Sequence, residues 1–207
     1  MNSKNSALIL IGYQNDYFAT DGILHDVIEE SSRATGVLAN TVELLTRVSS
    51  SEMLIVSTPI IFTPEYDELV EPVGILKMIK EVGAFNSGTK GSDTIPELTQ
   101  FGSRILEVPG KRGLNAFSNT ELDPLLKDRD IENVVLAGVV TSICIDSTGR
   151  WAFELGYKVS VLSDCTSGRT VVEQNFFCDN IFPLYAEVLD HRQLLSRLGI
   201  VANGRSK

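Results

Sequence analysis

The chain has little of several things that would assign it to a class directly. Its 207 residues include two histidines and three cysteines. Two isolated imidazoles are too few for the usual zinc sites, and an odd number of cysteines does not make a disulfide framework. No hydrophobic run approaches the roughly 20 residues of a membrane-spanning helix, and the short polar start at residues 1–6 lacks the pattern of a cleavable signal peptide. We therefore expect a protein of a reducing interior, located in the cytoplasm.

Positive charge is also scarce. Lysine and arginine number 18 against 27 aspartates and glutamates, which gives a net charge of -9. This balance opposes binding to nucleic acid or to an anionic membrane, and no local basic cluster reverses it. We expect a small-molecule substrate as the partner, with no nucleic acid and no membrane.

Short apolar or β-branched segments alternate with helical patterns along the chain. This alternation is typical of a parallel sheet with helices on both faces. We predict a single α/β domain over residues 1–207, Rossmann-like, with about six strands. The expected strands are residues 7–11, 53–57, 104–108, 133–137 and 158–162, with a sixth near 186–189 and a short helix over 191–198.

Cys144 is the first candidate for chemistry. It follows the predicted strand 133–137 and opens a predicted helix over 142–155. Unpaired N–H groups at a helix start favour thiolate over thiol and can also receive an oxyanion. The alternative is that Cys144 is a small buried apolar residue, as most free cysteines are, and the local context does not separate the two interpretations.

Polar segments follow the first, third and fourth predicted strands. They are residues 12–18, which contain Gln-Asn-Asp-Tyr; residues 109–117, which contain a lysine and end in Ala-Phe; and residues 138–146, a Gly-x-x-Thr-x-x-Cys turn. In this order and at these separations they resemble the isochorismatase-like cysteine hydrolases, which include nicotinamidases, carbamoyl amidohydrolases, ureidoacrylate hydrolases and isochorismatase. We expect the three strands to be neighbours, so that the three segments meet at one edge of the sheet.

The resemblance implies a role for each matching residue. Cys144 would be the nucleophile, and Lys111 the cation that favours its thiolate. Val140 and Thr141, together with Cys144, would supply backbone donors for an oxyanion hole. The resemblance also implies a cis peptide bond between Val139 and Val140. For Lys111 alone, a solvated loop lysine is the alternative interpretation.

Gly12 is the main departure from the family pattern. The family has Asp or Glu there, and that carboxylate carries protons during the reaction. General acid–base help is worth ~100-fold or more, so restoring a carboxylate that had simply been lost should raise turnover by at least that factor. The glycine is explained by deliberate replacement, by a natural pseudoenzyme, or by another proton carrier such as Asp16, water or the substrate.

Three functions stay open on these grounds. The first is a hydrolase that cleaves an amide-type C–N bond through an acyl-enzyme on Cys144, impaired or altered by Gly12. The second hydrolyses the vinyl ether of isochorismate, a reaction that does not require the thiol. The third is a catalytically dead ligand-binding protein.

Aromatic residues on the loops suit a small planar or cyclic substrate, although ordinary core packing is an equal alternative for each. Arg112 beside Lys111 is a candidate for binding a substrate carboxylate, or a solvated arginine. The aromatic candidates for substrate binding are Phe18, Phe62, Tyr66, Phe85 and Phe117.

Metal and cofactor are both expected to be absent. Nicotinamidases of this family carry an Asp-x-His…His cluster after the second strand, whereas residues 57–63 here read Ser-Thr-Pro-Ile-Ile-Phe-Thr. His25 is expected to be structural and His191 to lie on a surface helix. Cys165 and Cys178 match no motif and are expected to be structural.

Self-association is the last expectation. Relatives in the resembled family are commonly oligomers, and the predicted helix after the fourth strand carries apolar residues beyond those that its own core needs: Ile143, Trp151 and Phe153. We expect a homo-oligomer, either a dimer or a tetramer.

Overall fold

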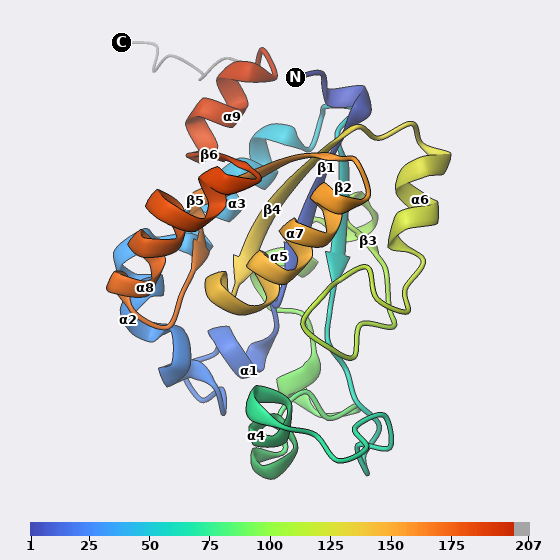
Figure 1. Cartoon of the computed structure of the whole chain (residues 1–207), viewed down its shortest axis with the longest axis vertical. Helices are drawn as coiled ribbons and strands as arrows, with labels where there is room; N and C mark the ends of the chain where they lie inside the picture. Colours follow the sequence, from blue (N-terminus) through green and yellow to red (C-terminus); the bar gives the residue numbers. More distant parts are fainter. Residues whose placement is uncertain (201–207) are drawn as a thin grey trace.

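A parallel six-stranded sheet runs through the part of the chain that the structure describes, which is residues 1–200 of a computed structural model (Figure 1). The strand order is β3-β2-β1-β4-β5-β6, so the direction of winding reverses between β1 and β4. The predicted α/β fold with helices on both faces is confirmed. The strands are β1 (Ser6–Ile11), β2 (Leu54–Thr58), β3 (Leu106–Glu107), β4 (Asn133–Val139), β5 (Lys158–Ser167) and β6 (Glu187–Leu189).

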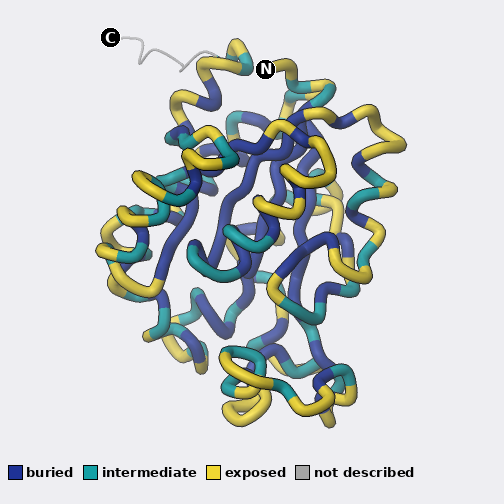
Figure 2. The backbone as a smooth tube through the Cα atoms, viewed as in Figure 1, coloured by how far each residue is buried: buried dark blue, intermediate teal, exposed yellow. Residues whose placement is uncertain are grey.

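Continuous apolar sequence makes the central strands. Every residue of β1, β2 and β4 is buried, which requires cover on both faces of the sheet. Figure 2 shows these strands as the buried centre and the helices with exposed outer surfaces. The helices of residues 1–200 are α1 (Asn15–Phe18), α2 (His25–Thr35), α3 (Val37–Val48), α4 (Gly74–Val82), α5 (Pro96–Thr99), α6 (Leu122–Asp128), α7 (Asp146–Glu154), α8 (Val171–Phe176) and α9 (His191–Arg197).

Alternate side chains of β1 point to opposite faces and separate two cores. Ala7, Ile9 and Ile11 pack in a core with residues of α6 and α7, whereas Leu8 and Leu10 pack with residues of α3, α5 and α9. This period of two is what strand geometry imposes. Helices therefore pack on both faces of the sheet, and this packing fixes the positions of the loops that follow the carboxyl ends of its strands.

A third apolar cluster, the cap cluster, lies beyond the carboxyl ends of β1, β2 and β4. It joins the loop after β1 to the long segment between β2 and β3, which includes α4 at the bottom of Figure 1. Segments of this kind usually shape a site in open α/β sheets. Its buried members are Tyr17, Leu24, Ile28, Ile60, Phe62, Tyr66, Leu69, Ile79, Ala84, Phe85, Val139 and Val140.

The strand neighbours differ in one respect from the expectation. β1 and β4 are adjacent, but β3 lies at the sheet edge with β2 between it and β1, so the expectation that all three strands are neighbours was wrong for the third. Lys111 nevertheless returns to the site, because the chain after β3 runs beside the continuation of β2 and forms an isolated parallel bridge between Lys111 and Ile60.

Close contact between β1 and β4 sets the position of the two turns that follow them. Gly138 pairs with Ile11 and has φ +120°. A Cβ at Gly138 would lie 1.9 Å from the Ile11 carbonyl oxygen, so only glycine fits there. The turn after β1 and the turn after β4 consequently begin side by side at the switch point.

Candidate active site

Lys111 and Cys144 form a buried pair at the switch point. The Lys111 Nζ lies 3.6 Å from the Cys144 Sγ, and it also donates a hydrogen bond of 2.5 Å to the Gly113 carbonyl. Lys111 is 1% exposed and Cys144 is 9% exposed. A buried ammonium is costly unless an opposite charge or a good acceptor faces it. The geometry therefore places a cationic donor directly against the Cys144 sulfur.

The Gln14 side chain holds Ile60, the residue after β2 that pairs with Lys111, in place. Its side-chain amide donates to the Ile60 carbonyl at 2.9 Å and to the Ser92 carbonyl at 2.8 Å, and its Oε1 accepts from the Ile60 N–H at 3.0 Å. Because Ile60 bridges to Lys111, this buried clamp links the turn after β1 to the lysine. The Gln of the first motif is thus a structural part of the site.

Cys144 sits in a π-helical turn, η4 (Thr141–Ile145), that leads into α7. The Val139–Val140 peptide bond is cis, as the resemblance implied. The carbonyl of Val140 accepts from the N–H groups of both Ile143 and Ile145. The expected regular helix from residue 142 begins instead at Asp146, because this doubly used carbonyl widens the first turn; such turns are common at functional sites.

The Thr141 side chain ties this turn to α8. Its hydroxyl donates to the Gln174 Oε1 at 2.5 Å, and the Gln174 amide donates in turn to the Ser163 carbonyl and to Thr166 in β5. These bonds anchor the turn that carries Cys144 to α8 and β5. The oxyanion role of Val140 and Thr141 remains a prediction.

A small cavity adjoins the Cys144 thiol. Its free volume is about 10 Å³, which is about the room that one water needs. Within residues 1–200, the titratable side chains that line it are those of Tyr17, Lys111 and Cys144. The other lining residues are mostly apolar: Ile11, Gly12, Ile60, Ile75, Leu76, Ile79, Phe85, Leu114, Val139 and Ile143.

Gly12 lines the cavity with a backbone shaped for glycine. Its φ is +74°, and a Cβ there would lie 2.9 Å from both the carbonyl oxygen and the Cγ2 of Val139. A side chain at this position is strained both by the left-handed conformation and by contact. The turn is therefore built around glycine, and a carboxylate cannot be restored here without moving the chain.

Asp16 is held away from proton transfer. Its Oδ2 accepts a 2.6 Å hydrogen bond from the Phe85 N–H, and it does not line the cavity. Burial raises the pKa of Asp16, while hydrogen bonds from the Phe85 and Ile23 backbone oppose that rise. The carboxylate joins the loop after β1 to the segment after α4, a structural role.

The predicted binding residues divide between the cavity and its surroundings. Phe85 lines the cavity. Phe62 and Tyr66 belong to the cap cluster, with ring centroids 5.5 Å apart. Phe18 stacks on Tyr13 at 5.3 Å on the other side of the turn.

Two further candidates lie outside the cavity lining. Phe117 stacks on Tyr157 at 6.1 Å in the core beneath α6 and α7. The Arg112 Nε donates to the Glu68 Oε1 at 3.0 Å, and its Nη1 donates to the Lys111 carbonyl. Their substrate-binding roles remain predictions.

The sequence interpretation missed several lining residues. Ile75, Leu76 and Ile79 come from α4, where the i, i+1, i+4 pattern indicates one apolar face but not what that face covers. Tyr17 belongs to the first motif and was treated as part of the motif only. The signal that could have indicated Tyr17 is its place in the same short segment, residues 12–18, that begins with Gly12.

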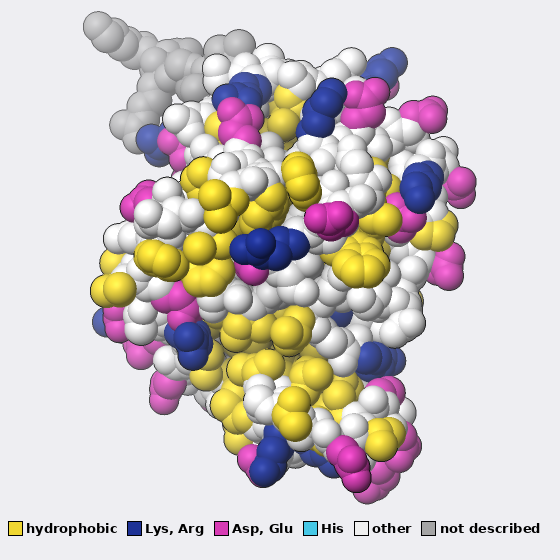
Figure 3. Space-filling model, viewed as in Figure 1, with side chains coloured by type: hydrophobic (Ala, Val, Ile, Leu, Met, Phe, Trp, Pro, Cys, Tyr) yellow, Lys and Arg dark blue, Asp and Glu magenta, His cyan; other side chains and the backbone are white. Residues whose placement is uncertain are grey.

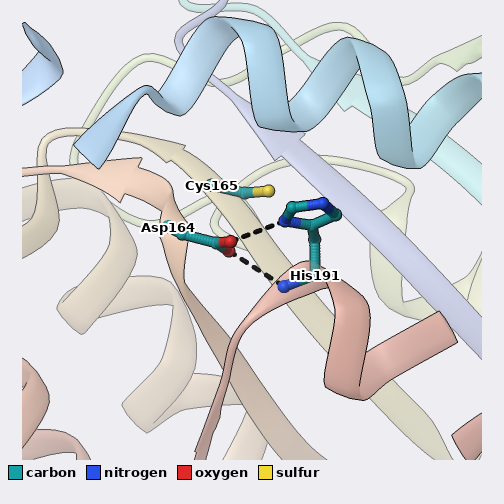
Figure 4. Close-up of side chains that lie close together, drawn as sticks. All are labelled: Asp164, Cys165 and His191. Atoms are coloured by element: carbon teal, nitrogen blue, oxygen red, sulfur yellow. Dashed lines mark hydrogen bonds and ion pairs between the residues drawn. The ribbon is translucent and has the colours of Figure 1, made fainter. Parts of the chain in front are cut away.

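His191 is buried, so the expectation of a surface position was wrong. It is 2% exposed; its Nδ1 lies 2.5 Å from the Asp164 Oδ2, and its N–H donates to the Asp164 Oδ1 (Figure 4). The Nε2 lies 3.5 Å from Glu43 of α3. His191 therefore fastens the start of α9 to β5 and α3, an interaction that no local pattern indicates.

Asp164, Cys165 and His191 together offer three possible ligand atoms within 4.8 Å of one another. Asp164 and His191 are already joined directly, and burial raises the pKa of the Cys165 thiol, which keeps it protonated. The Asp164–His191 contact joins β5 to the start of α9.

Fold and site together define a doubly wound α/β protein with a cysteine–lysine centre at its switch point. A sequence model described as the Isochorismatase domain matches residues 6–193. The chain belongs to the isochorismatase family.

Individual relatives agree with this assignment. The chain is 29% identical over 178 residues to the ureidoacrylate amidohydrolase RutB of Variovorax paradoxus, covering 80% of this chain and 70% of that protein. It is 34% identical over 88 residues to the uncharacterized isochorismatase family protein YecD of Escherichia coli O157:H7, which is 42% of this chain and 47% of YecD. A cysteine hydrolase from Pseudomonas syringae pv. phaseolicola shares the fold with a TM-score of 0.84 at 18% identity, over 96% of this chain and 94% of that one.

Across residues 1–200, no helix combines the length and the apolar character that a membrane span requires.

The Cys144 thiol should alkylate first. Burial raises the pKa of Cys178 to about 12 and also raises that of Cys165, so both remain thiols near pH 7. Cys144, beside Lys111, should react with iodoacetamide at least roughly tenfold faster than either. Mass spectrometry of peptides after brief treatment measures the order. Lys111→Met should slow Cys144, and labelling of Cys165 or Cys178 first would contradict the assignment.

Gly12→Ala should destabilise the fold by more than the backbone conformation alone explains. Gly88→Ala is the matched control, since Gly88 has φ +80° and nothing within 4 Å of a Cβ. The control should lose ~1–2 kcal/mol and Gly12→Ala ~1 kcal/mol more. Urea denaturation measures both. Equal losses would mean that Val139 yields, and the turn could then accept a carboxylate.

Proposed function

We propose that this chain hydrolyses an amide-type C–N bond of a small molecule, with Cys144 as the nucleophile. The observation that carries the proposal is the buried Lys111 ammonium 3.6 Å from the Cys144 Sγ. An amide carbonyl needs a strong nucleophile, and a thiolate beside a cation is one at neutral pH. The similarity to an amidohydrolase supports this reaction class.

The proposed reaction has two stages. The Cys144 thiolate attacks the carbonyl carbon, and the oxyanion is received by the backbone N–H groups of Val140, Thr141 and Cys144. The C–N bond then breaks, the amine leaves with an added proton, and a thioester remains. Water attacks the thioester, which releases the acid and restores Cys144. The lining of the cavity is mostly apolar, which favours a small substrate. Because the cavity has room for about one water, we expect α4, which forms part of its wall, to shift when the substrate enters.

Substitution of Cys144 tests this proposal. Cys144→Ala should lower turnover of an amide or N-carbamoyl compound by at least ~1000-fold, because the covalent step is lost. The assay is a panel of small amides, N-carbamoyl compounds and isochorismate, followed by product analysis.

The other functions are separate outcomes of the same panel. If the Cys144→Ala variant still hydrolyses isochorismate, the function is vinyl-ether hydrolysis and the proposal of amide hydrolysis is wrong. Binding without turnover of any compound would make the chain a ligand-binding protein, which is the alternative that Gly12 favours.

We also propose that the chain self-associates through the face formed by α7, α8 and the following turn. Trp151 and Phe153 are half exposed and Leu184 is 73% exposed. Figure 3 shows hydrophobic side chains gathered on this face. A monomer seldom leaves such a patch in water.

Light scattering tests the association. We expect a mass of two or four times 22.7 kDa at micromolar concentration, and Trp151→Glu should shift the mass toward the monomer. The control is Thr46→Glu at an exposed position of α3, which covers the other face of the sheet, and it should leave the mass unchanged. A monomeric wild-type mass would contradict the proposal.

A further inference from the structure

The cavity at Cys144 holds a nucleophile and a cation but no carboxylate. Within residues 1–200, its lining includes neither Asp nor Glu, and Gly12 has no side chain to carry a proton. An amine leaves an amide poorly unless a proton is added to its nitrogen. If the proposed reaction is right, another group in the lining must supply that proton.

Tyr17 stands beside the gap that Gly12 leaves. The residue belongs to α1 and is 5% exposed. Its Cδ2 lies 3.6 Å from the position of a Cβ on Gly12, and its ring packs at 5.2 Å from that of Phe85. A hydrogen bond that the Phe85 N–H donates to the Asp16 carboxylate holds the same turn in place. The Tyr17 ring is thus fixed against the cavity wall.

The Tyr17 hydroxyl differs from the other tyrosine hydroxyls of the chain. Tyr13 bonds to Thr41, Tyr66 to the Ala84 carbonyl, Tyr157 to Asp123 and Tyr185 to Asp146. Within residues 1–200 the Tyr17 hydroxyl makes no such bond, and its oxygen keeps some exposure although the residue as a whole is buried. A donor without a partner in the lining of the reactive cavity is available to a ligand.

The electrostatics keep this hydroxyl protonated. Burial raises the pKa of Tyr17 first, and the negative charge of the Cys144 thiolate raises it further, followed by that of Asp16. The phenol therefore remains a donor throughout neutral pH. The Lys111 ammonium, which lines the same cavity, is the charge that would stabilise a phenolate formed during turnover.

We propose that the Tyr17 hydroxyl is the proton donor of the Cys144 site, in place of the carboxylate that the family carries at position 12. This rests on the proposed amide hydrolysis. In the resting structure the hydroxyl has no partner, so it can turn toward the thiolate and the incoming substrate. When the C–N bond breaks, the phenol O–H breaks and its proton bonds to the leaving nitrogen. The phenolate then takes a proton from the water whose oxygen bonds to the thioester carbon, which restores Tyr17 and Cys144.

The first test needs no substrate. The rate of Cys144 alkylation by iodoacetamide is measured from pH 5 to 10 in wild type, Tyr17→Phe and Tyr13→Phe. The groups that face the thiol in the cavity are Tyr17 and Lys111, so loss of the Tyr17 donor should move the midpoint upward by at least about half a pH unit. Tyr13→Phe removes a buried hydroxyl from the same turn that bonds instead to Thr41 and the Cys165 carbonyl.

That control should leave the midpoint unchanged. An equal midpoint in wild type and Tyr17→Phe would overturn the proposal, and so would an equal shift in both variants, since that would report a general loosening of the turn.

The second test separates proton donation from positioning. Hydrolysis of 4-nitrophenyl acetate is compared with that of 4-nitroacetanilide. The nitrophenolate of the ester leaves without a proton, whereas the nitrogen of the anilide must receive a proton in order to leave. Tyr17→Phe should retain ester hydrolysis within about threefold and lose at least ~100-fold in kcat on the anilide. An equal loss on both probes would overturn the proposal.

The outcomes also distinguish this proposal from the proposed function. Cys144→Ala should abolish both activities. If the Cys144→Ala variant still hydrolyses the anilide, the proposed amide hydrolysis through Cys144 is wrong. The alkylation midpoint would in that case still decide whether Tyr17 donates to the thiol.

Discussion

The burial of the Lys111 ammonium against the Cys144 thiol is the interaction on which the site depends. A charged amine that is 1% exposed needs compensation from the groups around it. The Gly113 carbonyl satisfies one of its N–H groups and the Cys144 sulfur faces another. The Gln14 clamp on Ile60 serves the same end, because it fixes the strand extension that carries Lys111 inward.

A second constraint is the close approach of β1 and β4. Gly138 leaves no space for a side chain over Ile11, and Gly12 leaves little over Val139. These contacts bring the first turn and the Cys144 turn together with no intervening atoms. The same closeness, with the left-handed conformation of Gly12, strains any side chain placed at position 12.

The cavity follows from these two constraints. The rigid sheet supplies one wall, and the cap cluster, with the apolar face of α4, supplies the others. Water is nearly excluded, so charges inside act at short range and with little screening. In such a setting a hydrogen bond from the Tyr17 phenol, next to Gly12, is stronger than the same bond at the surface, because water does not compete for it.

Much of the fold was predictable from sequence, because fully buried parallel strands require continuous apolar runs and β1, β2 and β4 have them. The family resemblance pointed to Cys144 and Lys111, and the structure brings these two side chains within 3.6 Å of each other; their catalytic roles remain predictions. The tertiary structure alone decided that β3 lies at the edge, that His191 is buried against Asp164, and that Tyr17 and α4 close the cavity. Each of these depends on contacts between residues far apart in the chain, which local periodicity does not encode.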